Sequence, residues 1–149
     1  MHREDLRRSE EIGWVALNVL LHGLTPEELT SPGYTEEGWS IKDMMWHIAA
    51  WSADAASHFE RMRAGTFDPS EVQDTRTLNE AWFEISKELE LGTVKAEWYA
   101  ARTMMVERFG EAEGLPPEAD EWFDEAGGQH YGEHLEGLRV WVERLNSSG

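Results

Sequence analysis

The sequence predicts an all-α protein, an up-and-down four-helix bundle with long loops and one helix broken near Gly92. Apolar residues recur at three- and four-residue spacing in four long stretches, and Gly and Pro residues fall between them. No segment alternates apolar and polar residues between hairpin turns, so we expect no strands. A length of 149 residues fits one domain over residues 1–149.

The first predicted helix covers residues 3–23 and ends at Gly23 and Pro26. Its apolar positions follow the helical period and are Leu6, Trp14, Leu17, Leu21 and Leu24. Residues 25–39 are rich in Thr, Pro, Gly and Glu, which is typical of a long loop.

The second predicted helix begins after Ser40 and ends at Gly65. Ser40 has Asp43 three residues later, which is the spacing of a capping box. Apolar residues then continue at the helical period as far as Met62. Residues 66–75 predict a turn-rich connection.

The third helical stretch covers residues 76–90 and resumes at about Thr93 after a break around Gly92. The resumed part extends to about Phe109. An acidic connection follows over residues 110–128, with a short helical turn expected around Trp122.

The last predicted helix covers residues 129–145. Its apolar stripe consists of Tyr131, Leu135, Leu138, Val142 and Leu145. Such a stripe is what a helix needs to pack against neighbours in a bundle.

Charge and composition exclude several classes of function. The chain has 13 Lys and Arg residues against 30 Asp and Glu, a formal net charge of −17, so we expect no nucleic-acid partner and no anionic membrane partner. Cysteine is absent, which excludes disulfides, thiolate ligands and cysteine nucleophiles. We find neither a signal peptide nor a spanning segment, and expect a cytoplasmic protein.

Three of the six histidines predict a metal site. His130 and His134 are four residues apart, so they share one face of the last helix, as two ligands of one ion do. His47 lies on the second helix, and facing helices of a bundle can bring such side chains to one metal. Three imidazoles leave a position for water or substrate, as in catalytic zinc sites. Imidazole also suits Ni, Cu and Fe, so the ligands alone do not select the ion, and we expect Zn or Ni. Solvated or core histidines would show the same spacing.

Three segments resemble the DinB-like superfamily. Residues 38–51 (Gly-Trp-Ser-Ile-Lys-Asp-Met-Met-Trp-His-Ile-Ala-Ala-Trp) are similar to its helix-two signature, although Ser52 stands where that pattern often has Glu. Residues 129–135 resemble the His-x-x-x-His of its closing helix, and residues 79–83 resemble a segment of its ClbS/DfsB-like branch. The superfamily also includes bacillithiol transferases and the N-terminal domain of mycothiol-dependent maleylpyruvate isomerase.

The resemblance implies a divalent metal at one end of a four-helix bundle, with His47, His130 and His134 at the ligand positions. It also implies an enzyme that transfers or isomerises with a low-molecular-weight thiol, or that hydrolyses a reactive metabolite. The expected partner is a small-molecule substrate, and the protein is expected to be a monomer or a homodimer.

Eight tryptophans offer a second hypothesis, a metal-free resistance or binding protein. It would sequester or hydrolyse a small toxic compound in a Trp-lined cavity. Trp51 and Tyr131 are the best pocket candidates because each is close in sequence to a predicted ligand, although both fit core packing as well. A third hypothesis is association through an exposed helix face. The sequence identifies no general base and no hydrolase elbow.

Overall fold

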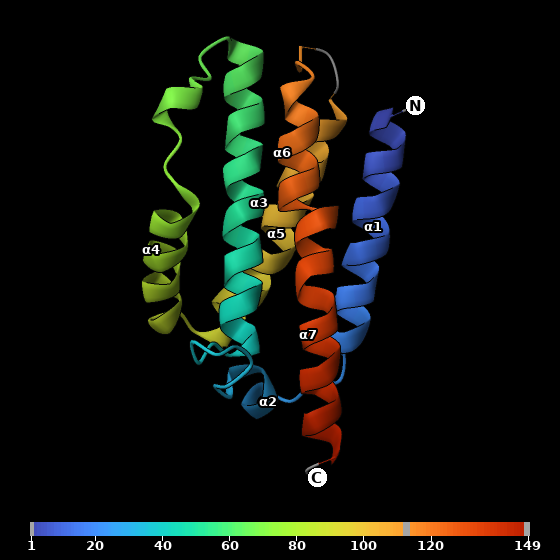
Figure 1. Cartoon of the computed structure of the whole chain (residues 1–149), viewed down its shortest axis with the longest axis vertical. Helices are drawn as coiled ribbons and strands as arrows, with labels where there is room; N and C mark the ends of the chain where they lie inside the picture. Colours follow the sequence, from blue (N-terminus) through green and yellow to red (C-terminus); the bar gives the residue numbers. More distant parts are fainter. Residues whose placement is uncertain (1, 112–113, 148–149) are drawn as a thin grey trace.

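The computed structural model describes residues 2–111 and 114–147, and these residues form helices and no strand. No described helix combines the length and the apolar composition needed to cross a membrane. The helices are α1 (His2–Leu21), α2 (Pro26–Thr30), α3 (Ile41–Ala64), a 3₁₀ turn at Pro69–Glu71, α4 (Thr75–Lys87), α5 (Leu91–Gly110), α6 (Glu118–Ala126) and α7 (Gly128–Ser147). The four longest, α1, α3, α5 and α7, lie side by side (Figure 1).

Helices α3 and α5 pack along one another and run in the same direction (Figure 1). At the start of α3, the Lys42 ammonium donates to the carbonyls of Ser86 and Leu89, just before α5 begins. At the far end of α3, the Arg63 guanidinium donates to the carbonyl of Arg108 near the end of α5. The two starts and the two ends therefore lie together.

Helices α1 and α7 form a second parallel pair. Gly128 at the start of α7 lies against Ser9, and Tyr131 lies against Gly13 one turn further along both helices. A Cβ atom added to Gly13 would be 3.1 Å from the Tyr131 ring, so the absence of a side chain allows this close approach. The alternation in direction predicted for four helices is therefore not found among the four longest, where α3 is parallel to α5 and α1 to α7 (Figure 1).

The reason is α4, which is a separate helix and not the first half of a broken one. The chain turns at residues 88–90, ahead of Gly92, and Lys42 binds carbonyls in this turn. Helix α4 lies on the outer side of α3 and runs antiparallel to it (Figure 1). It returns the chain to the start of α3, so α5 has to run parallel to α3.

Two predicted connections contain more helix than expected. The predicted loop over residues 25–39 includes α2, which starts at Pro26 with a capping box between Thr25 and Glu28. The predicted turn around Trp122 is α6, with nine residues. Both helices are too short for their apolar spacing to stand out in the sequence.

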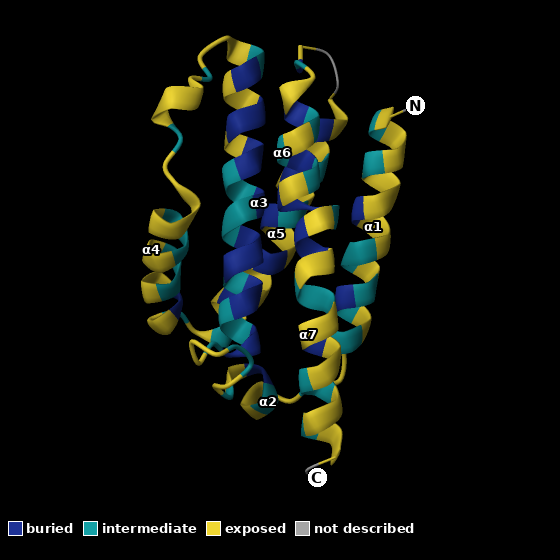
Figure 2. Cartoon of the chain, in the orientation of Figure 1, coloured by how far each residue is buried: buried dark blue, intermediate teal, exposed yellow. Residues whose placement is uncertain are grey.

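Two apolar clusters fill the interior. Buried residues are frequent along α3, whereas α4 and the end of α7 are mostly exposed (Figure 2). One cluster contains Leu17, Met44, Ile48, Trp98 and Leu138 among others, and the second contains Phe59, Met105, Phe109 and Phe123. The buried polar side chains of the interior include Glu10, Ser52, His47 and His130. Two histidines of the candidate site are therefore buried in the fold.

The capping box predicted at the start of α3 is present and can be tested by mutation. Ser40 accepts from the amide of Asp43, and the Asp43 carboxylate accepts from the Ser40 amide, which confirms the predicted capping box. We expect Ser40→Ala to lower the free energy of unfolding by about 1 kcal/mol, measured by urea denaturation. Ser70→Ala in the exposed 3₁₀ turn is the control, and an equal loss in both variants would contradict this role for Ser40.

Candidate metal centre

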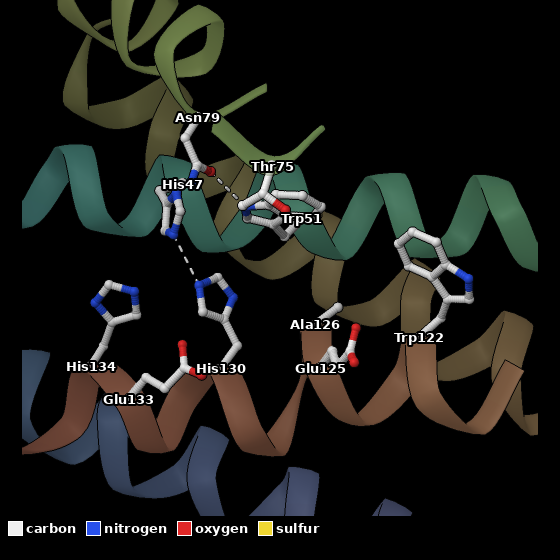
Figure 3. Close-up of a pocket in the computed structure, with 10 residues that line it drawn as sticks. All are labelled: His47, Trp51, Thr75, Asn79, Trp122, Glu125, Ala126, His130, Glu133 and His134. Carbon is white, nitrogen blue, oxygen red and sulfur yellow. Dashed lines mark hydrogen bonds between the residues drawn. The ribbon is translucent and has the colours of Figure 1, made fainter. Parts of the chain in front are cut away.

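The structure brings the three predicted histidines together between α3 and α7 (Figure 3). One ring nitrogen from each of His47, His130 and His134 lies within 4.8 Å of the other two. The Nε2 atoms of His47 and His130 are 2.9 Å apart, so one of these rings donates its N–H to the other. The predicted grouping of these side chains is therefore confirmed.

Local features of each helix position the three rings. His47 comes two turns after the Ser40 cap, on the α3 face that turns toward α7 (Figure 3). His130 and His134 are one turn apart at the start of α7. The break between α6 and α7 falls at Gly127 and Gly128, where an added Cβ would lie 2.8 Å from the Phe123 carbonyl and 2.9 Å from the Ser9 hydroxyl. These glycines let the start of α7 lie close against α1.

Two aromatic residues from the segment before α3 close the inner side of the cluster. The Tyr34 hydroxyl lies 3.3 Å from Nδ1 of His134 and also donates to the carbonyl of the same residue. The Trp39 ring lies 5.0 Å from the His47 ring, between centroids, and stacks on Phe83 of α4. These contacts fix the orientations of the His134 and His47 rings.

Burial keeps the three imidazoles neutral. Burial lowers the pKa of His47 to about 2, with a further contribution from His130 and His134. Burial and the neighbouring His134 lower the pKa of His130 to about 3, and burial alone lowers the pKa of His134 to about 4. Neutral imidazoles are the form that ligates metals.

The donor set fits a divalent transition metal. Three neutral imidazoles with no thiolate suit Zn or Ni and leave further coordination positions open. Nδ1 of His47, the ring nitrogen that does not face His130, is buried and has no hydrogen-bond partner among the described atoms. A metal bound at the Nε2 atoms would displace the N–H that lies between His47 and His130.

A pocket of ≈ 230 Å³ opens from the histidines toward solvent (Figure 3). Trp51 lines it, and its indole N–H donates to Oδ1 of Asn79 over 2.8 Å, which fixes the ring. Trp122 lies farther along the pocket, toward α6 (Figure 3). The lining residues are His47, Trp51, Thr75, Asn79, Trp122, Glu125, Ala126, His130, Glu133 and His134.

Tyr131, the other predicted pocket residue, does not line this pocket. Its side chain is fully buried, and its hydroxyl donates to Oε2 of Glu10 over 2.9 Å. Neighbours in sequence on a helix point about 100° apart, so proximity to His130 does not place Tyr131 in the same cavity. Its role in the structure is packing and hydrogen bonding inside the core.

The acidic residues that could support the ligands are otherwise engaged. Asp43 bonds within the Ser40 cap and accepts from the Ser86 hydroxyl. Asp54 lies 3.1 Å from His58, a buried histidine outside the cluster. Neither aspartate is therefore hydrogen-bonded to an imidazole of the cluster.

Sequence reasoning missed Tyr34 and the pocket residues of α4 and α6. Tyr34 belongs to the predicted loop, where no spacing links it to His134. Asn79 falls in a segment that carries the DinB-like resemblance, but only the packing of α4 on α3 brings it to Trp51. A long loop flanking a predicted site is the one general signal that could have indicated Tyr34.

The lowered histidine pKa values predict a loss of stability in mild acid. An ordinary histidine titrates near 6.5, so below that pH the unfolded chain binds more protons than the folded one, and the free energy of unfolding falls. Between pH 6.5 and 5 we expect His47 to account for about 1–2 kcal/mol of this fall. Urea denaturation of chelator-treated protein at pH 6.5 and at pH 5 measures this effect. The fall in the free energy of unfolding should be smaller in His47→Asn than in the natural chain, and equal falls would refute the prediction.

Comparison of the chain with protein-family models, with curated proteins and with solved structures found no match. The site is therefore interpreted from its own residues.

Proposed function

We propose that this chain is a divalent-metal-dependent enzyme of the DinB-like superfamily, with α1, α3, α5 and α7 as its four-helix bundle. It acts on a small electrophilic metabolite, as a thiol-dependent transferase or isomerase or as a hydrolase. The observation that supports this most is the meeting of His47, His130 and His134 at the inner end of a solvent-open pocket.

The residues of the site divide into three roles in this proposal. His47, His130 and His134 would hold the metal, which when bound would polarise an electrophile or lower the pKa of a water or thiol. Tyr34 and Trp39 cover the ligands on one side, so that substrate and water approach from the pocket. The pocket walls then bind and orient the substrate beside the ligands.

Metal analysis of protein purified without a His tag tests this function. We expect about one equivalent of Zn or Ni after incubation with the ion, and removal by chelator should abolish turnover of an electrophile panel assayed with and without thiols. Less than about 0.2 equivalents after incubation would refute the proposal, since an open three-ligand site should retain the ion.

A second candidate function is metal-free capture of a small toxic compound, and the indoles of Trp51 and Trp122 in the pocket favour it. Two aromatic walls suit an apolar ligand whether or not a metal is present. This function predicts ligand-induced changes in tryptophan fluorescence that persist in chelator. If His134→Ala removed metal and ligand binding together, the metal-free alternative would be lost.

A further inference from the structure

The pocket combines carboxylates with aromatic walls and contains no basic side chain among its described lining residues. Glu125 of α6 and Glu133 of α7 line it and are both exposed, so their carboxylates stand at its solvent side. Trp51 and Trp122 supply indole surfaces in the same pocket. In Figure 3 the histidines lie at one end, and Glu125 and Trp122 lie toward the other.

The two ends of the pocket differ in chemistry. At one end, the ring nitrogens of the three histidines lie within 4.8 Å of one another. Glu133 lies beside the histidines and Glu125 lies toward the other end (Figure 3), so an anionic group in the pocket would meet carboxylates and no Lys or Arg of the described lining. A cleft lined with charge of one sign raises the local concentration of ions of opposite sign.

The indoles add a second preference for positive charge. Trp51 is held by its hydrogen bond to Asn79 and by an edge contact with Trp82, 4.9 Å between ring centroids, so its orientation is preset. An ammonium group near the face of a tryptophan is attracted by the ring electrons, and quaternary ammonium ligands are commonly bound in this way. A preset ring needs little ordering when the ligand arrives.

We propose that the substrate of this site is an organic cation, a small molecule whose ammonium group binds near Glu125, Glu133 and the indoles while its reactive group reaches the histidines. The reaction of such a substrate rests on the proposed function, whereas binding of the cation does not. The chain's overall charge of −17 has the matching sign. Neutral and anionic molecules of the same shape should bind less tightly.

Ligand-observed NMR titration with three aromatic probes tests the proposal. Benzyltrimethylammonium cannot ligate a metal, so it reports on the cation subsite alone, and benzyl alcohol and benzenesulfonate are its neutral and anionic counterparts. We expect the cation to bind at least about threefold more tightly than either in chelator, where no metal charge contributes. Failure of metal binding would leave this preference measurable, so the two proposals can fail separately.

A charge-matched pair of double variants provides the control. Glu125→Gln with Glu133→Gln should weaken binding of the cation about two- to fivefold and leave benzyl alcohol unchanged. Glu121→Gln with Glu136→Gln removes the same charge from the same two helices at residues outside the pocket, and should have little effect. An absence of cation binding, equal binding of the three probes, or equal weakening in both double variants would overturn the proposal.

Discussion

His47→Ala is expected to lower the affinity of the protein for Zn or Ni by more than about 100-fold. Loss of an outer-shell partner alone commonly lowers metal affinity 10- to 100-fold, and in the proposed site His47 would supply a ligand itself. Its Nε2 is 2.9 Å from that of His130 and comes from the opposite helix, so no neighbouring side chain of α7 replaces it. Isothermal titration calorimetry of metal-free protein measures the change.

His22→Ala is the matched control, because His22 is exposed and lies outside the cluster. The affinity of His22→Ala for the metal should equal that of the natural chain. His134→Ala gives a second triad variant at a half-buried position, where truncation disturbs the core less. Circular dichroism and the urea midpoint establish that each variant is folded. Unchanged affinity in folded His47→Ala and His134→Ala would show that these histidines do not bind the metal.

Arg102→Ala is expected to lower the free energy of unfolding by about 3 kcal/mol. The Glu10 carboxylate is 1% exposed, and its two oxygens accept from Nε and Nη2 of Arg102 over 2.9 and 2.6 Å. Removing one partner of such a pair leaves a buried, uncompensated charge, which typically costs 3–5 kcal/mol. We expect the low end because Arg102 is itself 22% exposed.

The comparison variant is Arg76→Ala on α4, whose pair with Glu80 is exposed on both sides. Exposed pairs contribute little, so its urea midpoint should stay close to that of the natural chain. Tyr131→Phe removes only the hydroxyl that donates to Glu10 and should have an intermediate effect of about 1 kcal/mol. Equal stability of Arg102→Ala and Arg76→Ala would mean that the Glu10 carboxylate is protonated or hydrated in the fold.

Local sequence determined the bounds of α3 and the common helix face of two of the three clustered histidines. The Ser40 and Asp43 cap and the left-handed Gly65, with φ of 74°, bound α3 where the pattern predicts, because caps act within a few residues. The four-residue spacing of His130 and His134 places both rings on one helix face in any fold. Their meeting with His47 was predictable as a hypothesis, since facing helices of a bundle converge.

Only the tertiary structure decided the order of the helices and the surroundings of the site. The amphipathic pattern of α4 is equally compatible with half of a broken helix and with a separate helix, and packing on α3 selects the second. Tyr34 meets His134 across 100 positions, and Glu10 meets Tyr131 across 121. Apolar spacing indicates which face of a helix is buried but not which helix packs against that face. Contacts between distant residues are therefore known only from the tertiary structure.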